Sequence, residues 1–332
     1  MPLDRAVLAV TPPGAGVGGR GAVSVLRALG LGDLLTAVPA LRALAEALPR
    51  RRLILATPAS LAPLVALMGP VARRIELVDA RGLDDVPAGL RGVRTGVNLH
   101  GSGPESHRLL VAAGVRRLTA FRHASVPESA EGPEWHAGEH EVERWCRLLG
   151  AAGIDADPRR LHLEPPGAAA GHPLRGVTVV HPGATRAARR WPAERFAAVA
   201  RAERAAGRHV VVTGGPEEAL LARRVAAVAG LPDSAVLAGR TDVGAMAALV
   251  AAAGRVVCGD TGVAHLATAL GTPSVLVFGP TSPRAWGPPA ALRDRHRVVW
   301  AGRTGDPHGR TPHEGLLRIA SERVIEELAG LG

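Results

Sequence analysis

The chain has 332 residues, of which 47% are apolar, so it can form two domains with substantial cores. Its 40 lysine and arginine residues exceed its 30 acidic residues, which gives a formal net charge of +10. A basic balance can indicate nucleic-acid binding, but only 2% of residues are aromatic and single-stranded nucleic acids need aromatic stacking. The arginines are also scattered along the sequence. We therefore predict no nucleic-acid partner and at most peripheral membrane contact.

Cys146 and Cys258 are the only cysteines, and both lie in apolar surroundings. They predict neither a disulfide framework nor a cysteine-based zinc site. No uncharged apolar run reaches 18 residues, and the amino terminus lacks a basic segment followed by an apolar one. We expect a cytoplasmic protein.

Residues 1–21 contain a glycine pattern that imitates a dinucleotide site, because residues 14–19 fit G-x-G-x-x-G. A true dinucleotide-binding loop opens directly into a helix, and an acidic residue follows about 20 positions later. Here the glycines lead into another strand-like run. We interpret residues 1–21 as a flexible lead-in and predict no bound cofactor.

The pattern over residues 22–164 predicts an N-terminal α/β domain in which apolar strands alternate with helices. Strands are expected at 23–26, 52–57, 75–78 and 118–121, with a further strand-to-loop turn at 96–102. Helices are expected after Asp33, with a bend at Pro39, and at 61–68 and 140–150.

Polar residues follow two of these predicted strands. Asp33 lies between the first strand and the first helix, where it can be the helix N-cap or a general base facing a cleft. Asn98, His100 and Ser102 follow a later strand. Both positions are at the carboxyl ends of strands, where α/β folds bind ligands.

Two short segments contain residue types that bind metals, but neither has the context of a metal site. His136 and His140 do not have the His-Glu-x-x-His spacing of zinc proteases, so we interpret them as residues of a solvated loop and helix start. Residues 155–157 read Asp-Ala-Asp, but they lie after a helix rather than after a strand. We predict no metal site.

Residues 165–173 are rich in Pro, Gly and Ala and predict a linker. A second α/β domain is expected over 174–312, with strands at 177–180, 210–213, 236–238, 256–258, 274–278 and 297–300. Residues 313–332 predict a C-terminal helix, for which packing back on the N-terminal domain is one arrangement.

The stretch from 255 to 283 organises the second domain. It predicts a buried strand, a turn at Asp260, Thr261 and Gly262, a helix that ends at Gly271, and another buried strand. The free N–H groups and positive dipole end of such a helix suit a phosphate. An ordinary capped helix is the alternative interpretation.

Taken together, the loops resemble glycosyltransferase family 9, the ADP-heptose:lipopolysaccharide heptosyltransferases. The resemblance covers roughly residues 22–328 and rests on LGLGDLLTAVPALRAL, NLHGSGPESH, HEVERWCRLLG, HPGATRAARRWP, TGGPEE and GDTGVAHLATALGTPSVLVFGPTSP. It implies the GT-B architecture, an α/β fold of two Rossmann-like domains whose parallel sheets face across a cleft. It also implies metal-independent transfer with inversion at the anomeric centre.

The resemblance assigns roles to individual residues. Gly32 and Asp33 match the loop that carries the family's proposed catalytic base. The positions matched to the donor site are Thr185 and Arg189 at the diphosphate, Glu217 at the ribose, Thr241 near the adenine, and Asp260, Thr261 and Gly262 at the donor sugar and phosphates. His265 lies on the helix behind that loop, where packing is the favoured role.

Two departures from the family pattern concern substrate choice. Asn98 stands where the family commonly has Asp, in a loop with His100 and Ser102 that shapes the acceptor side. Arg189 replaces the usual Lys, which keeps the charge but changes its geometry. Neither departure removes a group that the chemistry needs.

The predicted function is heptose transfer from ADP-heptose, an ADP-sugar being the favoured nucleotide-diphosphate donor, to a hydroxyl of a glycan or small metabolite. Asp33 would deprotonate the acceptor, while Arg189, Thr185 and the helix start would stabilise the leaving diphosphate. A nucleotide-sugar-binding protein without catalysis and a GT-B epimerase or hydrolase remain alternatives.

Overall fold

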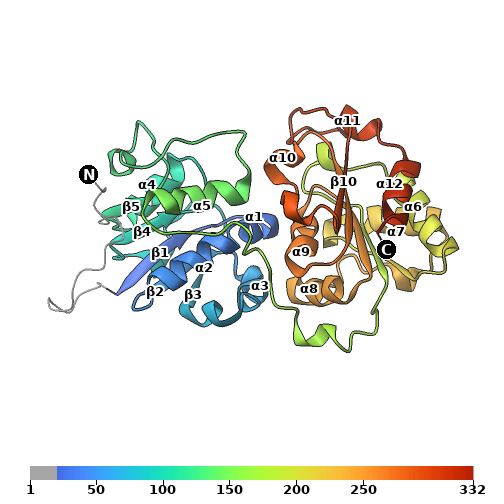
Figure 1. Ribbon diagram of the computed structural model, residues 1–332, viewed down its shortest axis with the longest axis horizontal. Helices are drawn as coiled ribbons and strands as arrows, with labels where there is room; N and C mark the ends of the chain where they lie inside the picture. Colours follow the sequence, from blue (N-terminus) through green and yellow to red (C-terminus); the bar gives the residue numbers. More distant parts are fainter. Residues whose placement is uncertain (1–20, 332) are drawn as a thin grey trace. The chain divides into compact units, whose positions relative to one another are not determined.

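The computed structural model describes residues 21–331. The glycine pattern at 14–19 and the lead-in of which it is part, apart from Gly21, lie outside the described residues. The chain forms two units, of which the first ends at Leu161 and the second begins at His162 (Figure 1). The predicted linker, 165–173, therefore belongs to the second unit.

The first unit contains a five-stranded parallel sheet with the order β3-β2-β1-β4-β5. Helices flank this sheet in Figure 1. The elements are, in chain order, β1 (Ala22–Leu26), α1 (Leu31–Thr36), α2 (Val38–Ala47), β2 (Arg52–Thr57), α3 (Ala62–Ala66), β3 (Ile75–Asp79), β4 (Thr95–Asn98), α4 (Glu105–Ala112), β5 (Arg117–Thr119) and α5 (Glu141–Ala151). Parallel strands buried on both faces explain the runs of valine and leucine in β1 and β2.

The first predicted helix is divided into two. α1 ends at Thr36, and α2 begins at Val38 with Pro39 in its first turn. Proline is tolerated there because its missing N–H would have no partner in the first turn. The interruption thus precedes Pro39 instead of bending one continuous helix at that residue.

The second unit contains another five-stranded parallel sheet, with the order β10-β9-β8-β6-β7. Its elements are β6 (Thr178–His181), α6 (Ala193–Ala205), β7 (Val210–Val212), α7 (Ala219–Ala229), α8 (Val243–Ala252), β8 (Arg255–Gly259), α9 (Gly262–Leu270), β9 (Ser274–Phe278), α10 (Pro283–Trp286), β10 (His296–Trp300), α11 (Glu314–Leu317) and α12 (Ser321–Ala329). The strand predicted at 236–238 is reduced to one parallel bridge between Val212 and Val236.

Within the second unit, the C-terminal segment packs on α6, β9 and β10. Trp191 explains this placement. Its indole is buried edge-on against Phe196, and its Nε1 donates to the carbonyl of Ile319 at 3.1 Å. Arg195 donates to the same carbonyl at 2.6 Å. The two side chains satisfy backbone groups in the turn between α11 and α12.

Nine arginines of the first unit that are far apart in the sequence gather at one edge of its sheet. Because parallel strands begin at the same edge of a sheet, the basic residues that precede β2, β3, β4 and β5 gather at that edge. We call it the amino edge; its residues are Arg50, Arg51, Arg52, Arg73, Arg74, Arg91, Arg94, Arg116 and Arg117. Arg52 pairs with Glu76, and Arg74 caps the end of α2 by donating to the carbonyls of Ala45 and Leu48.

Candidate functional site

Each sheet has one point at which the strand order reverses. In the first unit it lies between β1 and β4, and in the second between β6 and β8. Parallel α/β sheets bind ligands outside the carboxyl ends of the strands at this point. The register brings these ends level, since Leu26 pairs with Asn98 and His181 pairs with Cys258. Most of the predicted site residues lie in the loops and helix starts that follow these strands.

Asp33 is the third residue of α1 and not its N-cap, which is Gly30. Its Oδ2 accepts the Gly30 N–H at 3.2 Å, and its Oδ1 lies 3.7 Å from Nη2 of Arg27. The side chain is 30% exposed. Asp33 is therefore held in place and still accessible to a substrate hydroxyl, as a general base must be. Gly32 beside it is half-buried.

Asn98 is fully buried and organises the loop that follows β4. Its Oδ1 accepts the backbone N–H of His100, and its Nδ2 lies 2.8 Å from both Ser106 Oγ and His107 Nδ1. The other nitrogen of His107 lies 2.7 Å from the carbonyl of Phe121, which can only accept. His107 is thus the neutral Nε2–H tautomer, and burial lowers its pKa. Asn98 shapes the loop without being exposed to a ligand.

His100, in the same loop, interacts electrostatically with both Asp33 and Arg27. Burial and the Arg27 charge lower the pKa of His100 to about 4, against which the negative charge of Asp33 acts. The imidazole is therefore neutral at pH 7. Its Nδ1 is buried and has no hydrogen-bond partner among the described residues. Ser102, further along, is half-buried.

In the second unit the loops after β6 and β8 meet through a charged pair. Arg189 ends a short turn, and its Nη1 lies 3.9 Å from Oδ2 of the buried Asp260. The Nε of Arg189 is buried and has no partner among the described residues. Thr261 is the N-cap of α9, but its hydroxyl makes no capping hydrogen bond to the helix, which begins at Gly262. Donor groups at this helix start are therefore available to an anion.

Three further residues predicted for the donor site lie elsewhere in the second unit's loops and helices. Thr185 is exposed in the loop after β6. Thr241 precedes α8, where Asp242 caps the helix, and the hydroxyl of Thr241 is buried without a partner among the described residues. His265 stacks edge-on against Trp286 with ring centroids 5.9 Å apart. The contact agrees with a packing role for His265.

Of the two adjacent glutamates at this edge, Glu218 is half-buried, whereas the predicted Glu217 is exposed. The Glu218 carboxylate accepts the N–H of Gly215 at 2.8 Å and lies 3.9 Å from Nε2 of the buried His181. It also packs against Gly183, where an added Cβ would come within 2.2 Å of it. Burial lowers the pKa of His181, and the Glu218 charge opposes that shift. The sequence does not show which of the two adjacent glutamates faces inward, because that depends on the geometry of the short turn, Pro216–Glu218, in which both lie.

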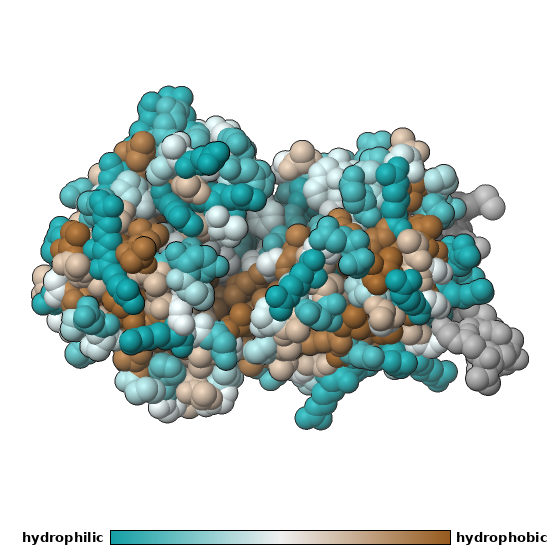
Figure 2. All heavy atoms as spheres, turned by 180° about the vertical axis from the view of Figure 1, so that it is seen from behind, coloured by the Kyte–Doolittle hydropathy of each residue, from teal (hydrophilic) through white to brown (hydrophobic). Residues whose placement is uncertain are grey.

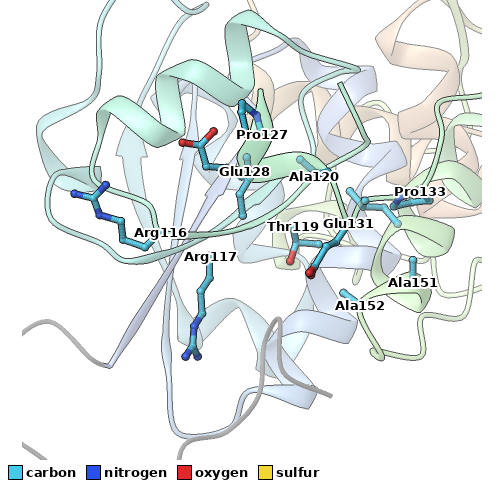
Figure 3. A pocket seen from close by; sticks show the side chains of 14 residues that line it. Arg116, Arg117, Thr119, Ala120, Pro127, Glu128, Glu131, Pro133, Ala151 and Ala152 are labelled. Carbon is cyan, nitrogen blue, oxygen red and sulfur yellow. The ribbon is translucent and has the colours of Figure 1, made fainter. Parts of the chain in front are cut away.

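A cavity of about 460 Å³ lies elsewhere in the first unit, beside β5 and the loop from 127 to 133. In Figure 3 Thr119 and Glu131 face each other there, while Arg117 points away. None of the predicted site residues lines this cavity. On the face in Figure 2, hydrophilic side chains alternate with small apolar areas.

The patterns that imitate metal sites have other partners. His140 is the N-cap of α5, and Asp157 forms a two-point ion pair with the adjacent Arg159. Among residues 21–331, no three His, Cys, Asp or Glu side chains are arranged to hold a metal ion. No helix in the same range is long and apolar enough to cross a membrane.

Two units, each with a parallel sheet and polar loops at its switch point, define an α/β protein of the doubly wound class. The family model of glycosyltransferase family 9 (heptosyltransferase) matches residues 111–313. The chain belongs to this family. It is 32% identical over 151 residues to lipopolysaccharide heptosyltransferase 2 of Escherichia coli K12, a match that covers 43% of each chain. The chain thus spans less than half the length of that relative.

Solved structures share the fold over nearly the whole chain. The structure of E. coli ADP-heptose lps heptosyltransferase II has a TM-score of 0.73 at 23% identity, covering 93% of this chain and 98% of that one. The family 9 glycosyl transferase from Veillonella parvula DSM 2008 has a TM-score of 0.75 at 21% identity, covering 96% and 98%. These likenesses confirm the α/β fold with two parallel sheets that the resemblance implied.

The contacts of Asn98 predict a pH-dependent effect of the family's more common residue. In Asn98→Asp, the carboxylate cannot donate to His107, so His107 must be doubly protonated to pair with it. We expect the pKa of His107 to rise above its unfolded value near 6.5. The pair then stabilises the fold below that pH and is lost as the pH rises through the folded pKa.

Urea unfolding at pH 5.5 and pH 8 measures this effect. Relative to wild type, the variant should lose more stability at pH 8 than at pH 5.5. Equal losses at the two pH values would contradict the His107 tautomer described above.

Proposed function

We propose that the chain is an inverting glycosyltransferase that moves a heptose from ADP-heptose to a hydroxyl of a glycan or small-molecule acceptor. Family 9 membership supports transfer as the reaction class. The structural observation that carries the proposal is the accessible Asp33 carboxylate, fixed at the switch point of the first unit. The likeness to E. coli ADP-heptose lps heptosyltransferase II supports ADP-heptose as the donor.

Asp33 takes the proton of the acceptor hydroxyl while that oxygen attacks the anomeric carbon. The bond from this carbon to the diphosphate breaks on the opposite face, which inverts the centre and releases ADP. Arg189 and the free N–H groups at the start of α9 stabilise the charge that develops on the diphosphate. The orphaned Nε of Arg189 provides a donor that the protein itself does not use.

The nucleoside is assigned to the loops after β6 and β7. We propose that Glu218 accepts hydrogen bonds from ribose hydroxyls, because its carboxylate is held at Gly215 next to the loop that carries Thr185. Thr241 supplies an unused hydroxyl for the adenine side. The assignment keeps the predicted ribose-binding acid but moves it by one residue, from Glu217 to Glu218.

Replacement of Asp33 tests the chemical step. Asp33→Asn keeps the size of the side chain but cannot accept the proton, so kcat should fall about 10²- to 10⁴-fold. The thermal midpoint shift produced by ADP should stay at its wild-type value, since Asp33 does not hold the donor. Unchanged turnover would remove Asp33 from its role, and a lost ADP shift would make it a binding residue.

A thermal-shift panel with ADP, GDP, UDP, dTDP and CDP tests the donor site, because a ligand of the native state raises the midpoint. We expect a shift with ADP. Glu218→Gln should weaken ADP binding roughly tenfold to a hundredfold, since a hydrogen bond to a charged group is lost. Glu217→Gln is the matched control and should bind ADP normally.

The panel and its follow-up also separate the alternatives. A preference for another nucleotide would keep the transferase and discard the heptose. ADP binding with no transfer would favour a binding protein without catalysis. Sugar release or epimerisation from the donor alone would favour a hydrolase or epimerase. Equal effects of the two glutamate substitutions would contradict the assignment of Glu218.

We further propose that the amino edge of the first unit makes peripheral contact with an anionic membrane on its cytoplasmic face. Each arginine near such a surface contributes about 1 kcal/mol.

The protein should therefore sediment with phosphatidylglycerol vesicles, less so at high salt, and not with phosphatidylcholine vesicles. Arg91→Glu with Arg116→Glu should weaken this binding at least tenfold. The exposed pair Arg223→Glu and Arg293→Glu is the control, and an equal loss there would show that only net charge matters.

A further inference from the structure

Three arginines and three aromatic rings form a mixed cluster under the Asp33 loop. Each guanidinium lies over one ring: Arg27 over Trp145 at 4.7 Å, Arg144 over Trp135 at 4.0 Å, and Arg147 over Phe121 at 5.2 Å. The three rings also contact one another, with centroids 5.1 to 6.0 Å apart. Flat cations and ring faces attract each other, most strongly when water is excluded.

The same arginines alternate with carboxylates in one chain of ion pairs. Its order is Asp33, Arg27, Glu141, Arg144, Glu139, Arg147. The ends are partly exposed, at 30% for Asp33 and 31% for Arg147, while Arg27, Glu141 and Arg144 are at most 5% exposed. Three positive and three negative charges cancel. Burial of the middle members is tolerable only because each of them is paired.

Arg27 joins the two loops at the switch point. Its Nε donates to the carbonyl of Asp33 at 2.8 Å, and its Nη1 donates to the carbonyl of Leu99, the residue before His100. Its Nη2 donates to Thr36 and to Glu141, at 3.0 and 3.1 Å. The planar fork of arginine can reach all these acceptors at once, which the single ammonium of lysine cannot.

Glu141 competes with Asp33 for the charge of Arg27. The closest approach to Nη2 is 3.1 Å for Glu141 and 3.7 Å for Asp33. Besides Arg27, Asp33 interacts with the N–H of Gly30 and, electrostatically, with the neutral imidazole of His100. If Glu141 were uncharged, Arg27 would stabilise the ionised Asp33 more strongly and make it a weaker base.

We propose that Arg27 is a positioning residue for Asp33 and that Glu141, which shares the Arg27 charge, sets how strongly that charge acts on the Asp33 carboxylate. The proposal rests on the proposed role of Asp33 in transfer. It assigns to Glu141, on α5, an influence on the base through one intervening side chain.

The pH profile of kcat/KM tests this coupling. In Glu141→Gln, which keeps an oxygen for the Trp145 N–H, the acid limb should move to lower pH and the maximal rate should fall several-fold. Glu139→Gln, one pair further along, is the control and should move the limb much less. Arg27→Lys should instead lower kcat with little change of the limb, since it keeps the charge but loses the fork.

An acid limb that stays in place in Glu141→Gln, or moves equally in Glu139→Gln, would overturn the electrostatic coupling. Full activity of Arg27→Lys would overturn the positioning role.

His100 gives a readout that needs no activity, because its imidazole responds to the same Arg27 charge. In NMR titrations, Glu141→Gln should lower the pKa of His100 further, and Arg27→Gln should raise it. If no donor supports transfer but these two shifts appear with opposite signs, the proposed function fails and the charge coupling stands. Absent or like-signed shifts would refute the coupling itself.

Discussion

The first unit depends on the burial of one guanidinium. Arg27 has no exposed surface, yet it carries a full charge, and an unpaired charge inside a protein is too costly to persist. The fold meets this cost with two carboxylates, two backbone carbonyls, a hydroxyl and an aromatic face. Satisfying Arg27 requires the ends of β1 and β4 and the start of α5 to lie together. The geometry of the candidate site is therefore a consequence of pairing this one charge.

Much of the fold could be predicted from the sequence, because strands buried on both faces and helix ends leave local signals. The turn at Asp260 and the left-handed Gly271 that ends α9 are examples, and the predicted family is confirmed. The break before α2 was less predictable. The break lies at Ala37, which has no distinctive side chain, whereas the sequence predicted a bend two residues later, at Pro39.

Residues of the site were harder to predict where distant segments decide the outcome. Arg27 and Glu141 are 114 positions apart, so no local pattern joins them. Glu217 and Glu218 differ only in which of them a short turn directs inward. The amino edge illustrates the same point, since arginines that are 20 or more residues apart become neighbours once the strands are parallel. In the sequence alone, these arginines are far apart, so their clustering cannot be predicted without the strand order.

Both switch points hold an arginine close to an aspartate, but the environments of the two arginines differ. Arg27 is fully buried, and four of its five N–H donors bind protein acceptors, so a ligand cannot reach it. Arg189 is 25% exposed, and its Nε has no partner among the described residues. In the proposed reaction, the first arrangement leaves the Asp33 carboxylate accessible to the acceptor hydroxyl, and the second leaves a cation for the donor diphosphate. A proton acceptor and an anion-binding group are the two charges that displacement of a diphosphate by a hydroxyl requires.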